Sequence, residues 1–238
     1  QESRGLGDVY KRQVYALMKA YREQHGRVER GAYPAILTSA SAHFSIARAA
    51  VAAGLGTDAV VHIRTDAHGR MDVRELERMC AEMQADAAHP QGVPLIVCAT
   101  SGTTVLGAFD DVAAIAEVCR KYDLWLHVDA SWGGAAAFLP HDAPERSVLA
   151  GLENAHSITI NPHKLLGVTH QCSFLLVHDK SVLIPPSHSD GGYLFHVPAE
   201  DALDMATKTL GCGRRGDALK FYLVWLRYGT QGLGDHIA

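Results

Sequence analysis

Six residues that could carry out chemistry lie just beyond apolar segments of the sequence, where each segment stops. They are His43, Thr103, Thr104, Asp129, His163 and Lys164. A lysine amine becomes a nucleophile when it loses its proton, and a buried aspartate can hold a neighbouring positive charge. Because such an amine forms a Schiff base with an aldehyde, the set suits covalent catalysis with an aldehyde cofactor such as pyridoxal phosphate.

Each of these residues alone also has an ordinary structural explanation. An aspartate that ends an apolar strand often caps the next helix, and a lysine in such a loop is usually solvated. His43 could cap or pack the start of a helix, and Gly-Thr-Thr without Gly-Lys-Ser/Thr is only a turn. The catalytic interpretation gains weight because the residues fall at equivalent points after several strands.

The elements that would position these residues alternate between strand and helix. Apolar strands are predicted at 35–39, 59–64, 94–100, 124–130, 156–160 and 172–178. Apolar spacings of three and four residues predict helices at 14–26, 43–54, 71–86, 110–123 and 216–229, with Asp72 as an N-cap. Nearly continuous apolar strands joined by helices indicate an α/β fold, with a mainly parallel sheet and helices on both faces. Ligands bind beyond the carboxyl ends of such strands, so the six residues would line one cleft.

Composition excludes several classes of function. A net charge of −4 gives no basic field for nucleic acid, and no apolar run approaches the roughly 20 residues of a membrane span. Five well-separated cysteines indicate reduced thiols in a cytoplasmic protein. Fourteen histidines without HExxH or paired Cys/His spacing predict no metal site.

Three segments differ in character. Residues 1–13 lack periodicity and are predicted to be a non-native or disordered leader, with a frayed helix start as the alternative. Residues 14–238 are predicted to form one domain. Within it, 185–202 is rich in Pro, Gly and His and is predicted to be a long loop, either functional or disordered.

Six motifs resemble, in order, those of the group II pyridoxal-phosphate-dependent amino-acid decarboxylases. They are SAHFSIARAA, TSGTTVLGAFD, HVDASWGG, NPHKLLG, QCSFLLV and CGRRGDALKFYLVWLRYGTQGL. The resemblance extends over residues 14–238 and implies the large domain of the fold-type I pyridoxal-phosphate transferase fold, which is aspartate aminotransferase-like. It also implies pyridoxal 5'-phosphate as cofactor, an amino-acid substrate and a homodimer. The Asn-Pro-His-Lys, Gln-Cys-Ser and Cys-Gly-Arg-Arg motifs are more similar to the glutamate/cysteine-sulfinate branch than to the aromatic branch.

The resemblance implies a role for each matching residue. Lys164 would hold the cofactor through a Schiff base, and Asp129 would pair with its pyridine nitrogen. His163 would contact its phosphate. His43 would stack on its ring and help to orient the substrate.

Three further residues would lie around the same ring. Thr104, with Thr103 beside it, would lie near the phenolic oxygen of the cofactor. Ser131 stands where the family usually has a small apolar alanine against the ring, so it adds a hydroxyl there.

The sequence also departs from the family pattern. The family's Gly-Gly-Ser-type phosphate-binding turn is not found before the helix that begins near Tyr15, and its C-terminal small domain is not found after Ala238. A partial cofactor-binding domain is therefore expected. The family tyrosine that protonates the product carbon is also not matched, and His196 is the nearest titratable group, with Tyr193 the only phenol nearby. We expect His196 or a water to take this role, or protonation to be slow enough for transamination to compete.

The sequence thus predicts decarboxylation of an L-amino acid to its amine, with glutamate, cysteine sulfinate or aspartate as substrate. Aromatic amino-acid and diaminobutyrate decarboxylases are alternatives. So is another pyridoxal enzyme of this fold, such as an aminotransferase or a cysteine desulfurase, although His43 with Asn-Pro-His-Lys favours decarboxylation. A non-catalytic truncated homologue that acts as a dimerisation partner is an alternative from a different class.

Overall fold

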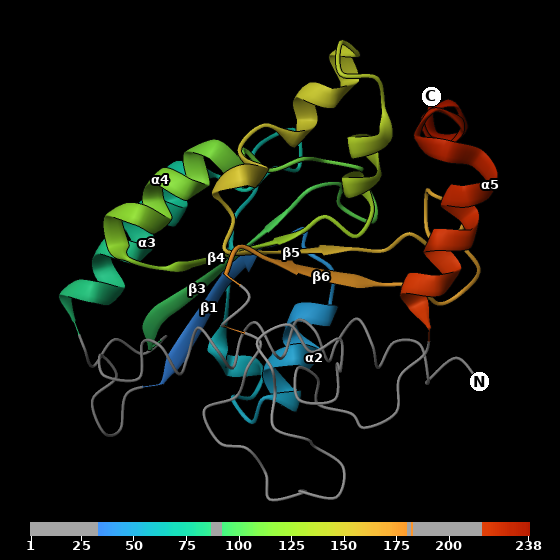
Figure 1. The fold of residues 1–238 in the computed structure, drawn as a ribbon. Coiled ribbons are helices and arrows are strands. Elements are labelled where there is room, and N and C mark those ends of the chain that lie inside the picture. Colours follow the sequence, from blue (N-terminus) through green and yellow to red (C-terminus); the bar gives the residue numbers. More distant parts are fainter. Residues whose placement is uncertain (1–32, 87–91, 180–181, 183–215) are drawn as a thin grey trace, which may run out of the picture.

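The protein is built around a six-stranded sheet, seen in a computed structural model that describes residues 33–86, 92–179, 182 and 216–238 (Figure 1). The strands are β1 (Pro34–Ser39), β2 (Val60–Ile63), β3 (Val93–Thr100), β4 (Trp125–Asp129), β5 (Ser157–Ile160) and β6 (Phe174–Val177). Their order in the sheet is β2-β1-β3-β4-β5-β6. The first five are parallel, and β6 is antiparallel to β5. The predicted mainly parallel sheet is confirmed.

Helices cover both faces of this sheet, as predicted. The α-helices are α2 (Ser45–Ala52), α3 (Val73–Ala85), α4 (Val112–Tyr122) and α5 (Asp217–Ile237). Short 3₁₀ helices, which the sequence did not predict, are η2 (Thr57–Ala59), η3 (Gly133–Phe138), η4 (Pro144–Leu149) and η5 (Leu152–Asn154). Figure 1 shows α3 and α4 on one face and α2 on the other. The predicted helix 14–26, leader 1–13 and loop 185–202 lie outside the described residues.

Two apolar cores explain why the strands are almost continuously apolar. Leu37 and Leu126 lie in the core shared with α3 and α4, while Ile36 and Trp125 lie in the core shared with α2. Successive strand residues point to opposite faces, so a strand covered on both sides needs apolar residues at nearly every position.

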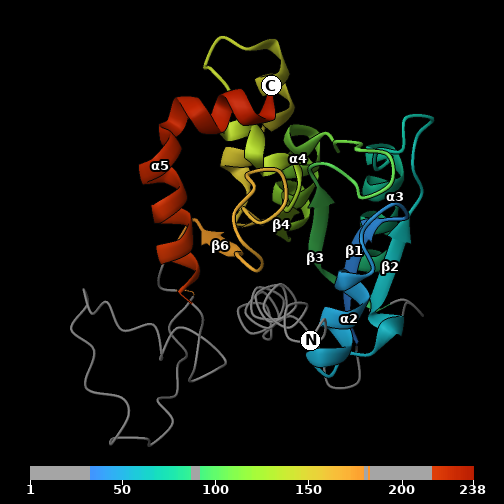
Figure 2. The ribbon, with the colours of Figure 1, turned by 90° about the vertical axis from the view of Figure 1, so that its right-hand side faces the viewer.

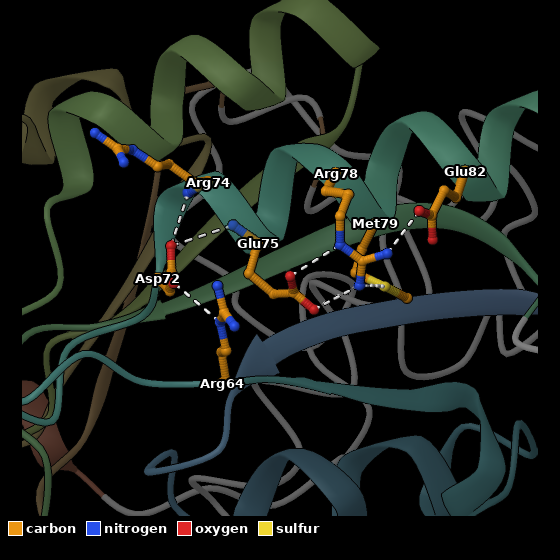
Figure 3. Close-up of polar contacts among 7 residues, drawn as sticks. All are labelled: Arg64, Asp72, Arg74, Glu75, Arg78, Met79 and Glu82. Carbon is orange, nitrogen blue, oxygen red and sulfur yellow. Dashed lines mark hydrogen bonds and ion pairs between the residues drawn. The ribbon is translucent and has the colours of Figure 1, made fainter.

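The start of α3 is fixed by polar contacts that Figure 3 displays. One carboxylate oxygen of Asp72 accepts hydrogen bonds from the amides of Arg74 (3.0 Å) and Glu75 (3.2 Å), which confirms it as the N-cap. Its other oxygen accepts from Arg64 at 3.0 Å, and Arg78 pairs with Glu75 at 2.7 Å. Exposed ion pairs contribute little to stability, so the cap is the more important contact.

The last helix is longer than predicted. Its apolar pattern predicts an end at Gly229, yet α5 continues to Ile237. Gly229 has non-helical dihedrals (φ 67°, ψ 178°), which glycine adopts readily, so it bends the helix instead of ending it. Figure 2 shows the bend. Beyond it, the buried Leu233 packs with Ala135 of η3, and this contact holds the second part of the helix.

Within the described residues, the structure shows no membrane-spanning helix, no metal-ligand cluster and no disulfide. None of the helices there is both long and apolar enough to cross a membrane. In the same ranges, no three His, Cys, Asp or Glu side chains gather as metal ligands would. Four cysteines in this part of the chain are buried thiols that form no disulfide: Cys80, Cys98, Cys119 and Cys172.

Candidate active site

The loops that follow β3 and β4 are joined at the carboxyl edge of the sheet. Asp129 lies beside Thr100 in the strand register, and its carbonyl accepts a hydrogen bond from the Ser101 amide at 2.9 Å. The Gly133 amide donates to the Ser101 carbonyl at 3.0 Å. Gly102 has a φ of 90°, and a Cβ there would lie 3.0 Å from the Gly133 nitrogen. Glycine therefore allows the Gly-Thr-Thr turn to lie against the loop that carries Asp129.

Asp129 is buried at this junction, with 7% of its surface exposed. One of its carboxylate oxygens accepts from the Ser131 amide at 3.1 Å, which fixes the carboxylate at the end of β4. Its negative charge acts on both His43 and Lys164, where it partly offsets the lowering of their pKa values by burial. Three predicted residues, from the ends of β1, β4 and β5, therefore lie within electrostatic reach of one another.

Lys164 is held on a tight turn after β5. Its amide donates to the Asn161 carbonyl at 2.9 Å, and the Val168 amide donates to the Pro162 carbonyl at 3.1 Å. The residue as a whole is exposed. Burial by its surroundings still lowers the pKa of the amine, and Asp129 opposes this effect. The neutral, nucleophilic form is therefore more populated than in an ordinary surface lysine.

His43 lies just before α2 and is partly buried. Its Nδ1 accepts a hydrogen bond from the Ser45 amide at 3.3 Å, which leaves the proton of the neutral ring on Nε2. Burial lowers the pKa of His43, with Asp129 raising it and Lys164 lowering it. A neutral, oriented ring is suited to stacking on a flat heterocycle.

His163 is anchored by the backbone of a residue on the chain leading into β6. Its Nδ1 lies 2.5 Å from the Cys172 carbonyl oxygen and 3.1 Å from the Cys172 amide nitrogen. Burial lowers the pKa of His163, and the Cys172 carbonyl opposes this effect. Nδ1 can donate to the Cys172 carbonyl or accept from the Cys172 amide, but not both at once. When it accepts from the amide, the proton of the neutral ring is on Nε2, which can then donate to a ligand. The sequence did not predict this contact, because nothing local links the two residues.

The other predicted residues have different surroundings. Thr103 is buried, and its hydroxyl oxygen accepts from the Ala108 amide at 2.9 Å, which closes the turn after β3. Thr104 is exposed on that turn, and Ser131 is buried beside Asp129. His196 lies outside the described residues.

Five buried side-chain polar atoms in the described part of the chain have no hydrogen-bond partner, and three of them come just after a strand at this edge: Ser101 Oγ, Ser131 Oγ and Asn161 Oδ1. They follow β3, β4 and β5, as the amine and carboxylate do. An unpaired buried polar group costs about 1–3 kcal/mol, so a polar ligand that paired with them would be stabilised. Amine, carboxylate, imidazoles and unpaired hydroxyls together fit pyridoxal phosphate. Asn161 was not predicted, although its place directly after an apolar strand was a usable signal.

His127 forms a second polar group beneath the site that the sequence did not predict. Only 2% of it is exposed, and its Nδ1 lies 2.8 Å from Ser157 Oγ, which also accepts from Trp125 Nε1 at 3.0 Å. Burial lowers the pKa of His127 to about 4, with Asp129 opposing this effect, so the ring is neutral at pH 7. Alternation along β4 places Trp125, His127 and Asp129 on one face, which was the available signal.

Comparisons with known proteins identify relatives of this chain. Residues 9–238 match the family model described as the pyridoxal-dependent decarboxylase conserved domain. Human cysteine sulfinic acid decarboxylase is 46% identical over 206 residues, which cover 85% of this chain and 40% of that protein. L-aspartate decarboxylase dtxS4 of Metarhizium robertsii is 44% identical over 204 residues, covering 85% and 39% respectively. The crystal structure of mouse CSAD aligns with a TM-score of 0.81 and 38% identity, covering 95% of this chain and 47% of that one. The chain thus spans about 40% of the length of the curated relatives it matches.

Proposed function

Because the chain belongs to the pyridoxal-dependent decarboxylase family, we propose that it forms the cofactor-binding part of an enzyme that decarboxylates an acidic L-amino acid. The observation that carries the proposal is the grouping of Lys164, Asp129 and His43 at the carboxyl edge of the sheet. Relatives named for cysteine sulfinic acid and L-aspartate support glutamate, cysteine sulfinate or aspartate as substrate.

Lys164 is proposed to hold the cofactor covalently and to release it to the substrate amine. Burial lowers the pKa of its amine, and this favours the neutral form that attacks a carbonyl carbon. The turn from Asn161 to Val168 fixes the backbone while the side chain stays long and movable. The amine can therefore leave and return without a change in fold.

Asp129 is proposed to keep a proton on the pyridine nitrogen of the cofactor. When bound, pyridoxal phosphate supplies an electron sink for the bond that breaks at the substrate α-carbon. A buried carboxylate fixed by the Ser131 amide stabilises a positive charge at its side without needing to reorganise. Ser131 Oγ, Ser101 Oγ and Asn161 Oδ1 are available for the polar groups around the ring.

The two histidines are proposed to orient opposite ends of the ligand. The neutral His43 ring, fixed by the Ser45 amide, would stack on the heterocycle and direct the α-carboxylate. His163, anchored at Nδ1 by Cys172, would direct Nε2 to the phosphate. The hydroxyls of Thr103 and Thr104 are proposed to lie near the phenolic oxygen.

His196 is proposed to deliver the proton to the α-carbon after carbon dioxide leaves. The support is its position in the sequence, as the nearest titratable group to the unmatched family tyrosine. His196→Phe should then slow amine release and raise the share of transamination product, measured as the amine-to-aldehyde ratio. Clean, fast amine production by this variant would assign the proton to water instead.

The proposal is tested by loading the purified chain with pyridoxal 5'-phosphate. We expect an absorbance band near the visible edge and, after borohydride reduction and peptide mass mapping, covalent label on Lys164. Lys164→Ala should remove both signals, while Lys121→Ala, at an exposed lysine of α4 that pairs with Glu77, should keep them. The loaded chain is then incubated with L-glutamate, L-aspartate, L-cysteine sulfinate, L-phenylalanine and L-2,4-diaminobutyrate, and amines are separated by chromatography.

The outcomes separate the alternatives. Amine from an acidic substrate supports the proposal, whereas amine from phenylalanine or diaminobutyrate alone favours the aromatic or diaminobutyrate alternative. Keto-acid product without carbon dioxide would favour an aminotransferase. A chain that takes up no cofactor at saturating concentration would favour the non-catalytic dimerisation partner.

A homodimer and a cytoplasmic location are part of the same proposal. Self-association is supported by the exposed apolar residues of α5, which include Tyr222, Leu223, Trp225 and Leu226. Sedimentation velocity would show a monomer if this is wrong. Reduced, buried cysteines support the cytoplasm, and fractionation of cells that produce the protein would test it.

A further inference from the structure

The first turn of α5 makes a cluster of polar contacts with the three residues 171–173 that precede β6. Asp217 is only 2% exposed, and its carboxylate accepts from the Ser173 amide at 3.2 Å. Its carbonyl accepts from Cys172 Sγ at 3.4 Å. Lys220 donates to the Gln171 carbonyl at 2.5 Å and pairs with Asp217 at 3.4 Å. All three consecutive residues are thus held by one helical turn.

The same short segment holds the His163 ring. Cys172, its middle residue, presents its carbonyl oxygen and its amide nitrogen to Nδ1 of the ring. Gln171 and Ser173 on either side are the residues fixed by Lys220 and Asp217. A displacement of the segment would therefore move the anchor of the histidine that precedes Lys164.

The polar contacts are not needed to attach α5 to the rest of the protein, because apolar contacts already do so. Phe221 lies edge-on to Phe174 of β6 at 5.6 Å and to Phe138 of η3 at 6.0 Å. Leu233 packs in the same cluster. A charged pair with one buried partner, such as Asp217 with the partly exposed Lys220, adds little net stability over such packing but restricts geometry.

We propose that Asp217 and Lys220 are positioning residues that hold Gln171, Cys172 and Ser173 so that His163 presents Nε2 to the phosphate of the cofactor. This inference rests on the proposed function. It assigns to the first turn of α5, far from Lys164 in the sequence, a part in phosphate recognition. Neither residue is required to touch the cofactor.

The test compares two aldehydes that differ only in the phosphate. The chain and its variants are titrated with pyridoxal 5'-phosphate and with pyridoxal, and occupancy of Lys164 is measured after borohydride trapping, with Lys164→Ala as background. Lys220→Met and Asp217→Asn should weaken apparent affinity for the phosphate ester by roughly tenfold or more, the effect of a charge-assisted hydrogen bond. Affinity for pyridoxal should change less than about twofold, since no phosphate contact is lost. Lys121→Met serves as the matched surface control.

Two further variants separate positioning from general destabilisation. Lys220→Arg should restore most of the affinity, because guanidinium can also donate to the Gln171 carbonyl. In a His163→Gln background, Lys220→Met should cause no further loss of affinity for pyridoxal 5'-phosphate, since both changes remove the same contact between His163 and the phosphate. The positioning role would be overturned if a variant lost equal affinity for both aldehydes, or if the losses from His163→Gln and Lys220→Met added in the double variant. The proposed function would stand in either case. A wild-type chain that traps neither aldehyde on Lys164 would overturn both.

Discussion

Among single residues, Asp129 couples the titration of its neighbours. Burial lowers the pKa values of His43, His127 and Lys164, and the negative charge of Asp129 opposes this effect in all three. Groups that interact in this way titrate as a set, so a pH profile of the site belongs to all of them. His127 differs from the other two because it is almost fully buried, with Nδ1 bonded to Ser157 and Nε2 to Thr159.

Burial of neutral His127 predicts a loss of stability in mild acid. The unfolded ring takes up a proton near pH 6.5 and the folded ring only near pH 4, so the unfolded state binds more protons between these values. The contribution is intact above pH 6.5, falls as pH drops below it and is fully lost below about pH 4. By pH 5 the free energy of unfolding should fall by roughly 2 kcal/mol on this account.

Urea unfolding at pH 7 and pH 5 measures this difference. His127→Gln should show a smaller drop between the two values, because glutamine does not titrate and can still bond to Ser157. His62→Gln, at an exposed residue of β2, is the control for removing a histidine. An unchanged pH dependence in His127→Gln would contradict the assignment.

Among the elements, the second part of α5 depends on one close approach. A Cβ at Gly234 would lie 2.5 Å from the Phe138 carbonyl oxygen, which belongs to backbone and cannot yield easily. Gly234→Ala should therefore push α5 from η3 and lower the free energy of unfolding by about 2 kcal/mol. At Gly232, the nearest atom to a Cβ is Tyr228 Cβ of the same helix, at 3.1 Å.

Urea denaturation of the two alanine variants gives the comparison. Gly232→Ala should stay within about 1 kcal/mol of the wild type, because the preference of alanine for helix offsets its close approach to Tyr228 Cβ. If Gly234→Ala is as stable as Gly232→Ala, the contact with η3 does not hold the helix.

Local signals account for the elements that the sequence predicted correctly. Apolar continuity identified six strands, and Asp72 was identified as a cap from its place before an apolar-periodic run. The end of α5 was wrong because glycine after such a run usually ends a helix, and only tertiary contact through Leu233 shows otherwise. The antiparallel direction of β6 also has no local signature, since it follows from how the chain returns to the sheet.

For the whole molecule, the part of the site that could be predicted was the part set by topology. Parallel strands bring their carboxyl ends to one edge, so His43, Asp129 and Lys164 could be grouped without coordinates. The anchoring of His163 by Cys172 could not be predicted, because it depends on how the loop between β5 and β6 folds. The sequence also could not show that Ser101 Oγ and Asn161 Oδ1 are buried without a hydrogen-bond partner, because their burial depends on how the loops assemble.

The strand order has a consequence for how the protein reaches its native state. Thr38 on β1 donates to the Cys98 carbonyl on β3, a contact that spans 60 residues, and the Ser173–Asp217 contact spans 44. Contacts between such distant parts of a chain form slowly, because the entropy cost of closing a long loop comes before any stabilisation by the contact. No early, local folding intermediate can hold both His43 and Lys164 in place. During refolding, the rate at which an aldehyde attaches to Lys164 would therefore report the last stage of folding. This attachment should be slower than the recovery of the helical signal from α3 and α4.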